Sequence, residues 1–434
     1  FLDEENNEIF RKYKDKYSNQ EITEVIESEI DLQRVLSRAC KDFDGGYAMA
    51  GMVGHGDAFV ARDPNGIRPA YFYKDDEVIV VASEKPAIKT AFNVDYDQIE
   101  EILPGHALIM KKNGEAGQYQ FIEPKEKKSC SFERIYFSRG TDPNIYQERK
   151  RLGRLLVPQV LKAINFDLKN TVFSYIPNTA ETAFLGLMTG MEDYLSNLRK
   201  EVVIEKKPVM DTIEDFLAFR PRVEKIILKD AKLRTFITDD NARDEMVAHV
   251  YDTTYEVIRK GVDTLVIMDD SIVRGTTLEK SILTMLARLE PKKVVIVSSA
   301  PQIRFPDCYG IDMSKMSEFV AFRAMIALVK DKDKEHLIGE VYERAKWALE
   351  NGNAVNHVNE LYNQFTPEEI SAKIAEIVKP EEMTADLEVV YQTVENLHVA
   401  CPNHSGDWYF TGNFPTPGGM RVAIRSFVNY MEGI

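Results

Sequence analysis

Two adjacent carboxylates followed by a polar turn are the residues of this chain best suited to chemistry. An apolar run from Leu265 to Met268 precedes Asp269 and Asp270. The next seven residues form the turn Ser271-Ile272-Val273-Arg274-Gly275-Thr276-Thr277, and apolar residues at helical spacing follow it. The pattern predicts a buried strand, two acids at its carboxyl end, and a helix after the turn.

Such a turn is suited to binding a phosphate group. Its free backbone N–H groups and the positive end of the following helix dipole attract anions, and Gly275 lets the backbone approach closely. Asp269 and Asp270 can hold the vicinal hydroxyls of a sugar or, directly or through water, Mg²⁺. A sugar phosphate would satisfy both halves of the motif. The competing interpretation is that the two acids only cap the following helix.

Strands and helices alternate around this motif. The sequence predicts strands at Asn170–Ile176, Thr264–Met268 and Lys293–Ser298, and helices at Thr182–Met191, Ala242–Lys260 and Thr276–Leu289. Alternation of this kind predicts a parallel sheet with helices on both faces. The charged segment 192–222 interrupts the alternation, and we interpret it as an insertion at the rim of the sheet.

The residues before this region have a different pattern. Residues 1–42 are charged and helical in spacing, and from Gly45 short apolar or alternating runs are separated by turn residues. The runs predict an antiparallel sheet, with strands near Tyr47–Val53, Ala58–Ala61, Pro69–Tyr73, Glu77–Ala82 and Ala107–Lys111. After about residue 330 the chain is again helical and charged. We therefore predict three parts, residues 1–128, 129–330 and 331–434.

Composition narrows the class of protein. The chain has 434 residues and a net charge of −15, which disfavours nonspecific binding to nucleic acid or to an anionic membrane. Four cysteines do not make a disulfide framework, and no apolar run is long enough for a membrane span. These features predict a cytoplasmic protein that binds small anions locally. Because Phe1 is neither an initiator methionine nor part of a signal peptide, we expect the chain to be a fragment of a longer polypeptide.

The acid pair and its turn resemble the phosphoribosyl pyrophosphate (PRPP) motif of type I phosphoribosyltransferases. Four further segments occur in the order typical of amidophosphoribosyltransferases: Arg62–Pro69, Cys130–Arg139, Arg234–Ile237 and Ala300–Pro306. By itself, Arg62–Pro69 could be only a tight loop. The resemblance runs from about Gly45 to Leu328 and returns at Phe410–Pro415. It implies an α/β fold, a type I phosphoribosyltransferase parallel sheet flanked by helices, preceded by the second half of an N-terminal-nucleophile glutaminase-like α+β domain.

The resemblance also implies a function. The family consists of glycosyltransferases that make 5-phosphoribosylamine from PRPP and glutamine-derived ammonia, the committed step of purine biosynthesis. By this resemblance Asp269 and Asp270 bind the ribose hydroxyls and Mg²⁺, and the turn 271–277 surrounds the 5-phosphate. Thr179 lies where the family has a hydroxyl near the metal and pyrophosphate, although a helix N-cap is an equal alternative. Purine nucleotides are expected feedback ligands, and a homo-oligomer is the expected assembly.

Two features depart from the family. Its glutaminase uses a cysteine at the mature N-terminus, whose own amine is the base. Here the first residue is Phe1, and the first cysteine, Cys40, has a helical setting that favours packing. We therefore expect no glutamine hydrolysis by this chain as given.

The second departure is the loop after Arg234–Ile237, which in the family is basic and closes over PRPP. Thr238–Val250 instead contains four acids, with Arg243 as the certain cation and candidate catalytic contact, while His249 is a partial substitute or plain surface. Two functions therefore stay open: an enzyme, and a noncatalytic regulator that binds PRPP or nucleotides on the same fold.

Some family members hold a [4Fe–4S] cluster. Cys130, Cys308, Cys401 and His404 lie in or near the segments that carry its ligands, and Cys401-x-x-His404 has a ligand-like spacing. The hypothesis is a structural iron–sulfur cluster or a zinc site. The competing interpretation is three buried thiols and an exposed histidine.

Overall fold

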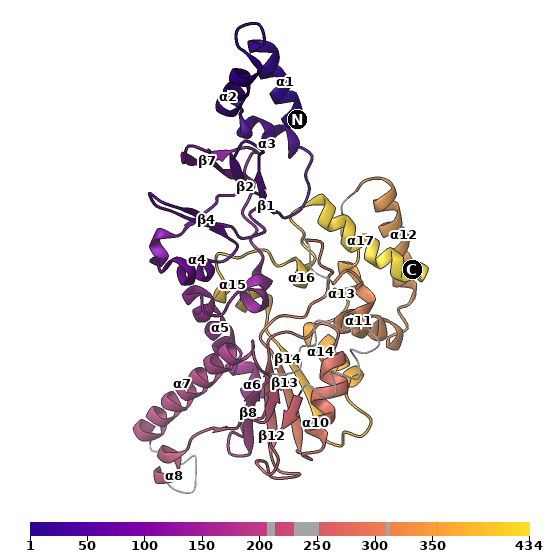
Figure 1. Cartoon of the computed structure of the whole chain (residues 1–434). Helices are drawn as coiled ribbons and strands as arrows, with labels where there is room; N and C mark the ends of the chain where they lie inside the picture. Colours follow the sequence, from indigo (N-terminus) through magenta and orange to yellow (C-terminus); the bar gives the residue numbers. More distant parts are fainter. Residues whose placement is uncertain (206–212, 230–250, 310–312, 354) are drawn as a thin grey trace.

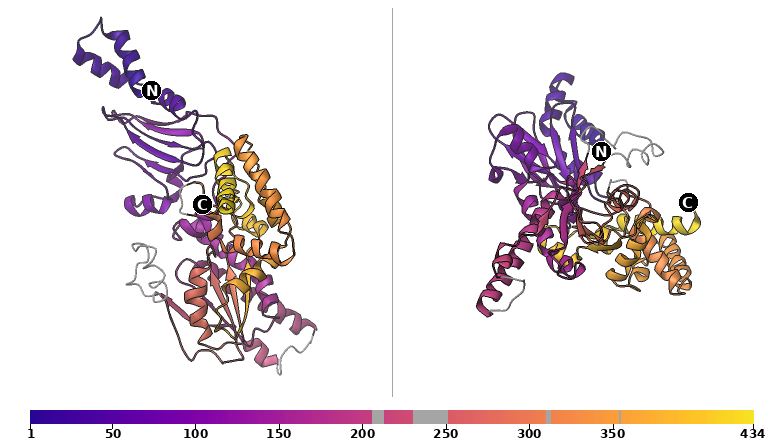
Figure 2. Two further views of the ribbon diagram at one scale, coloured as in Figure 1. Left: turned by 90° about the vertical axis from the view of Figure 1, so that its right-hand side faces the viewer. Right: turned by 90° about the horizontal axis from the view of Figure 1, so that it is seen from below.

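A computed structural model describes residues 1–205, 213–229, 251–309, 313–353 and 355–434. An antiparallel region and a parallel α/β region lie end to end, and helices from the last part of the chain pack along one side (Figures 1 and 2). None of the described helices combines the length and apolar character that crossing a bilayer requires.

Helices form the N-terminal tip of the molecule in Figure 1: α1 (Leu2–Tyr13), α2 (Asn19–Glu29) and α3 (Leu32–Ala39). The side chains of Ser18 and Asp31 cap α2 and α3 by accepting hydrogen bonds from backbone N–H groups in the first turn. Leu32 and Leu36 of α3 are buried against the neighbouring sheet together with Cys40. The packing role expected for Cys40 is confirmed.

Two antiparallel sheets follow these helices. Their strand orders are β1-β2-β6-β7 and β4-β3-β5. The strands are β1 (Ala48–Met52), β2 (Ala58–Arg62), β3 (Tyr71–Lys74), β4 (Ile79–Ala82), β5 (Glu100–Glu101), β6 (His106–Met110) and β7 (Ala116–Gln120). Helix α4 (Lys85–Phe92) packs against β3 and β4, and the short helix η1 (Tyr96–Gln98) follows it. The predicted antiparallel region is confirmed by the pairing of every one of these strands.

The motif Arg62–Pro69 is a buried junction between the two regions. The Asp63 carboxylate accepts hydrogen bonds of 3.0–3.2 Å from three backbone N–H groups of the same turn. Arg68 forms an ion pair of 2.7 Å with Glu133 and donates a hydrogen bond to the carbonyl of Tyr309. The turn therefore connects the antiparallel region to the α/β region, which a plain surface loop would not do.

A five-stranded parallel sheet with the order β14-β13-β12-β8-β9 forms the centre of the α/β region. Its strands are β8 (Thr171–Tyr175), β9 (Arg222–Val223), β12 (Thr264–Asp269), β13 (Lys293–Ser298) and β14 (Asp386–Tyr391). In β12, Leu265 and Ile267 face one hydrophobic core, and Val266 and Met268 face another. Both faces of the sheet are therefore covered, as the continuous apolar run of this strand predicts.

One face of the sheet is covered by α6 (Val157–Ala163) and α7 (Glu181–Glu205), and α5 (Pro143–Leu155) packs on α7 with an unusually close approach. A Cβ atom on Gly153 would lie 1.7 Å from the carbonyl oxygen of Ala183, and one on Gly186 would lie 1.9 Å from that of Lys150. Only glycine fits at these two positions, so the crossing depends on them.

One expectation about this region is corrected. The helix predicted at Ala242–Lys260 is wrong in its described part, because residues 251–253 form strand β11 (Tyr251–Thr253), paired antiparallel with β10 (Ile227–Lys229). The insertion expected at 192–222 stays a prediction, and the structure shows that α7 continues to Glu205 and is followed by α8 (Ile213–Ala218). The alternating apolar pattern of a short strand cannot be distinguished from helix in so charged a sequence.

The expectation of an all-helical segment after residue 330 is wrong at β14, which pairs in parallel with β13. The surrounding helices are as expected: α11 (Val320–Asp331), α12 (His336–Glu350), α13 (Asn359–Tyr362), α14 (Pro367–Val378), α15 (Val394–Ala400), α16 (Trp408–Thr411) and α17 (Pro417–Glu432), with a 3₁₀ turn, η5 (Met316–Glu318), before α11. They bury side chains in the same hydrophobic core as β12 and β13. The C-terminal segment is therefore an integral part of the α/β region.

The crossing of α5 and α7 gives a stability prediction. Gly186→Ala should lower the free energy of unfolding by at least about 2 kcal/mol, because its Cβ would overlap a backbone carbonyl that cannot rotate away. Gly339→Ala is the control, since Gly339 lies within α12 with open space around it. This control should raise stability by about 0.5–1 kcal/mol, because alanine has the higher helix propensity. Urea unfolding measures both, and equal effects would contradict the close crossing.

Candidate functional site

The acid pair lies at the carboxyl end of the central strand, as the sequence predicts. Asp269 is the last residue of β12, and Asp270 follows it. The chain after β13 holds their backbone, because the carbonyls of Asp269 and Asp270 accept hydrogen bonds of 3.0 Å from the N–H groups of Ser299 and Ala300. Both carboxyl groups are half-buried at this edge of the sheet.

The two carboxyl groups are destabilised as anions. Burial, and then the charge of Asp270, raise the pKa of Asp269 well above its ordinary value. Burial also raises the pKa of Asp270, to about 6, even though the hydroxyl of Ser271 donates to its Oδ1 at 3.1 Å. Neither carboxylate forms an ion pair with a lysine, arginine or histidine of the described part of the chain. The charge of the two acids is therefore not neutralised by direct contact with a cation of the described residues.

In the turn that follows, backbone carbonyls accept hydrogen bonds from neighbouring residues, whereas several backbone N–H groups have no acceptor among the described residues. The carbonyl of Val273 accepts from the N–H of Val320 at 2.9 Å, and that of Arg274 accepts from the Arg323 guanidinium at 2.6 Å. Within the described ranges, the N–H groups of Ile272 to Gly275 have no recorded hydrogen-bond acceptor. An anion at the turn would supply one.

Gly275 lets the turn pack closely against its neighbours. Its φ is +77°, in the left-handed region, and a Cβ there would lie 3.0 Å from the side chain of Val378. The helix predicted at Thr276–Leu289 begins directly after it, with a π-helical first part, η4 (Leu278–Leu283), and then α10 (Thr284–Ala287). The strand–turn–helix arrangement expected around the acids is therefore present.

Thr179 lies beside the acid pair. It belongs to the turn between β8 and α7, and its hydroxyl lies near enough to the Asp270 side chain to favour the charged form of that carboxyl, which lowers its pKa. Two neighbouring strands thus bring Thr179 and Asp270 to the same edge of the sheet. The contact places the hydroxyl where it can also reach a bound cation.

Arg149 is a member of the site that the sequence analysis missed. Its guanidinium is buried and donates to the backbone carbonyls of Arg134, Tyr136 and Ser138 at 2.7–3.2 Å. Its charge also lowers the pKa of Asp270, although less than burial raises it. No sequence signal separates it from the other cations of α5, which lie toward solvent.

Two tyrosines also lie near the acids. Burial and the charges of Asp270 and Asp269 raise the pKa of Tyr136, in the π-helical turn η2 (Glu133–Phe137), and the same causes raise the pKa of Tyr251 to about 12. Both phenols are therefore protonated at neutral pH and can donate hydrogen bonds. Arg243, His249 and the rest of the segment Thr238–Val250 lie outside the described residues, so the structure does not place the candidate catalytic cation.

The acid pair fits a magnesium site. Mg²⁺ in nucleotide and phosphate sites is held by one or two carboxylates together with substrate oxygens and water. Asp269 and Asp270 supply two such carboxylates, and their raised pKa values show that a positive charge would be favourable there. Among the described residues, Asp270, Asp269 and the hydroxyl of Thr179 could supply oxygen ligands.

The residues of the suggested iron–sulfur or zinc site do not come together. Among the described residues, no group of three or more cysteine, histidine, aspartate or glutamate side chains is placed to hold a metal ion. Cys130 and Cys401 are buried, Cys308 packs near Gly419, and burial raises the pKa of each thiol. The interpretation of Cys130, Cys308, Cys401 and His404 as a metal centre is therefore wrong for this structure, because the thiols take part in core packing.

The raised pKa of Asp270 predicts a stability that falls as pH rises. The folded carboxyl keeps its proton to about pH 6, whereas an unfolded aspartate loses it near pH 4, so stability is lost across this window. Asp270→Asn should therefore be more stable than the parent at pH 7.5, by on the order of 1 kcal/mol for a half-buried group. The gain should shrink toward pH 4. Urea unfolding in EDTA at both pH values measures it, and an equal gain at both would show that Asp270 titrates normally.

Comparison with known proteins finds relatives that agree with one another in their described function. A family model described as a glutamine amidotransferase domain matches residues 4–90. The amidophosphoribosyltransferase of Lachancea kluyveri is 28% identical over 327 residues, which cover 73% of this chain and 56% of that protein. The Escherichia coli K12 enzyme is 29% identical over 288 residues, which cover 64% of this chain and 50% of that protein. The chain thus spans about half the length of the curated relatives it matches.

A solved structure shares the fold. Glutamine PRPP amidotransferase from Bacillus subtilis, in complex with ADP and GMP, matches with a TM-score of 0.57 and 22% identity, covering 94% of this chain and 74% of that chain. The match includes both the parallel five-stranded sheet and the antiparallel region before it. The sequence matches and the shared fold identify the chain as a homologue of the amidophosphoribosyltransferases, at about 28% identity over most of its length.

Proposed function

We propose that this chain carries the phosphoribosyltransferase activity of an amidophosphoribosyltransferase, joining the phosphoribosyl group of PRPP to ammonia. One observation carries the proposal: two carboxylates without an ion-pair partner stand beside a turn whose N–H groups have no recorded acceptor among the described residues. A sugar phosphate that carries a cation complements both. The homology to amidophosphoribosyltransferases supports the same substrate.

The chain's own residues account for most of the proposed chemistry. The N–H groups of the turn hold the 5-phosphate, and Asp269 and Asp270 bind the ribose hydroxyls and the metal ion. As pyrophosphate leaves the anomeric carbon, positive charge develops on the ribose, and the nearby carboxylates stabilise it electrostatically. Mg²⁺, when bound, neutralises charge on the leaving pyrophosphate. The site must also exclude water so that ammonia is the nucleophile.

Ammonia is the nitrogen donor that an assay should supply. Residues 4–90, which match the glutamine amidotransferase domain, contain Cys40 as their single cysteine. Cys40 is fully buried, and burial raises the pKa of its thiol, so it is not a thiolate nucleophile. Any supply of glutamine-derived ammonia therefore has to come from residues other than these.

Purine nucleotides are proposed as competing ligands of the same turn. The Bacillus subtilis structure is a complex with ADP and GMP. A nucleoside 5-phosphate shares the ribose 5-phosphate part of PRPP, so the N–H groups and carboxylates described above can bind either one.

Removing either carboxylate should abolish most of the activity. Asp269→Asn and Asp270→Asn should each lower PRPP-dependent release of pyrophosphate by about 10²–10³-fold with excess ammonia and Mg²⁺, because each removes charge that stabilises the transition state. Glu290→Gln is the control, since Glu290 is exposed, pairs with Lys260 and lies beyond the end of α10. Parent-like turnover in both aspartate variants, with the fold retained, would refute the proposal.

Binding separates the enzyme from the noncatalytic alternative. PRPP at 100 times its Kd should stabilise the chain by about 2.7 kcal/mol, and this gain should require Mg²⁺ because the acids repel a metal-free pyrophosphate. Thermal unfolding with and without EDTA measures it. Mg²⁺-dependent binding without turnover would assign the chain to the regulators, and stabilisation that persists in EDTA would contradict the metal site.

A further inference from the structure

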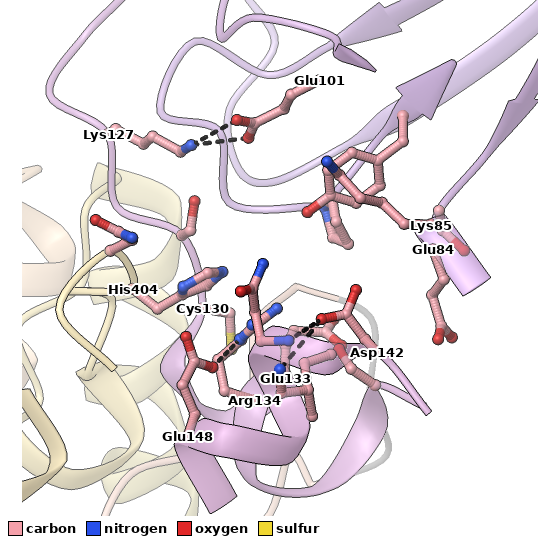
Figure 3. Close-up of a pocket in the computed structure, with 18 of the residues that line it drawn as sticks. Glu84, Lys85, Glu101, Lys127, Cys130, Glu133, Arg134, Asp142, Glu148 and His404 are labelled. Carbon is pink, nitrogen blue, oxygen red and sulfur yellow. Dashed lines mark hydrogen bonds and ion pairs between the residues drawn. The ribbon is translucent and has the colours of Figure 1, made fainter. Parts of the chain in front are cut away.

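A cavity of about 750 Å³ lies between the antiparallel and α/β regions. Figure 3 shows its walls, which come from the start of α4, the segment between β7 and η2, the first turns of α5 and the loop that contains His404. None of its lining residues belongs to the acid pair or the turn 271–277. Ligand sites are common at such domain junctions.

Much of the charge on its walls is already neutralised. Glu101 forms ion pairs with Arg62 at 2.6 Å and with Lys127 at 2.8 Å. Arg134 pairs with Glu148 at 2.5 Å (Figure 3), and both side chains are buried. These pairs stabilise the junction, and their charges are not available to a ligand.

Lys85 is a cation without a carboxylate partner among the described residues. Its Nζ donates to the carbonyl of Ile99 at 3.0 Å and lies 5.4 Å from the ring centroid of Tyr71. Both contacts fix the ammonium group in place at the cavity wall, yet neither supplies a negative charge. The group is therefore a preorganised binding point for an anion.

Asp142 is the matching anion. It begins α5 and is buried, and its Oδ1 accepts hydrogen bonds from the backbone N–H groups of Asn144 and Ile145 at 2.8 and 3.1 Å. No lysine, arginine or histidine of the described chain pairs with it, and Lys85, on the same side of the cavity in Figure 3, is not within ion-pair distance. Lys85 and Asp142 therefore line the same cavity without forming an ion pair with each other.

Unpaired charges at a partly buried wall are costly unless a ligand satisfies them. We propose that this cavity binds a small zwitterion of the free amino acid class, with its carboxylate on Lys85 and its ammonium group on Asp142. The ligand carries both charges because the wall presents one of each sign. This inference concerns a site apart from the proposed PRPP site and does not depend on it.

The rest of the cavity favours a neutral ligand over an anion or a cation. The lining carries equal numbers of formal positive and negative side chains, five of each: Arg62, Lys85, Lys127, Arg134 and Arg151 against Glu84, Glu101, Glu133, Asp142 and Glu148. His404 adds none, because burial and the nearby charges of Arg134 and Lys127 lower its pKa to about 3. A nucleotide or an inorganic anion would leave Asp142 without a cation, whereas the ammonium group of a zwitterion would supply one.

Three related compounds test the charge requirement. L-serine is the zwitterion, N-acetyl-L-serine keeps only the carboxylate, and L-serinamide keeps only the ammonium group. Equilibrium dialysis and calorimetry with the full chain, without PRPP, should show saturable binding of L-serine. Each single-charge analogue should bind about 10- to 100-fold more weakly, since it leaves one wall charge unpaired. If none binds, or if an analogue binds as tightly as L-serine, the proposal is overturned.

Two variants test the assigned contacts. Lys85→Met should remove the preference for L-serine over L-serinamide, and Asp142→Asn should remove the preference for L-serine over N-acetyl-L-serine. Asparagine also caps helices well, so Asp142→Asn keeps the start of α5. Lys89→Met and Asp95→Asn are matched controls, because these residues pair with each other at 3.6 Å outside the cavity.

The controls should retain the parent affinities, and unchanged preferences in both test variants would overturn the assignment. Because the assay measures binding without PRPP, its result is independent of the proposed phosphoribosyltransferase activity. The Asp269 and Asp270 variants test turnover, and the Lys85 and Asp142 variants test serine binding. Either prediction can therefore fail while the other holds.

Discussion

The central position of β12 is the constraint on which the rest of the site depends. Its side chains alternate between two hydrophobic cores, so the strand cannot place a polar group anywhere except at its end. There the chain places two successive carboxylates and then a turn whose carbonyls are held by neighbouring groups. Burial raises the pKa of both acids, and a bound cation would favour their charged forms. The buried acids thus lower the stability of the folded chain at neutral pH, and the same acids attract a cation.

Helix α5 separates two charged environments. Glu148 faces the junction cavity and pairs with Arg134, whereas the next residue, Arg149, is directed to the carbonyls of the η2 turn and influences Asp270. The close crossing with α7 at Gly153 and Gly186 holds this helix in position. One rigid element therefore forms a wall of both the acid site and the cavity.

The junction between regions relies on buried arginines satisfied mainly by backbone oxygens. Arg62 donates to the carbonyls of Arg68, Gly66 and Ile102 in addition to its ion pair with Glu101. Arg68 extends the network to Glu133 and Tyr309. Such a network fixes geometry through directional bonds, which apolar packing alone would not do. Through this network the turn-rich motif Arg62–Pro69 of the antiparallel region contacts the α/β region directly.

The sequence by itself determined the parallel strand, the acid pair, the turn and the antiparallel region, because each has a local pattern of apolar spacing, turn residues and charge. It could not determine the roles of Arg149, Lys85 and Asp142, which depend on neighbours distant in the chain. Nor could it place β14, whose pairing with β13 joins segments about 90 residues apart, a separation no local pattern records. The prediction of a metal centre was wrong for the same reason. The Cys401-x-x-His404 spacing is local, whereas a metal centre needs side chains that converge in space. Tertiary packing places these thiols in the core instead.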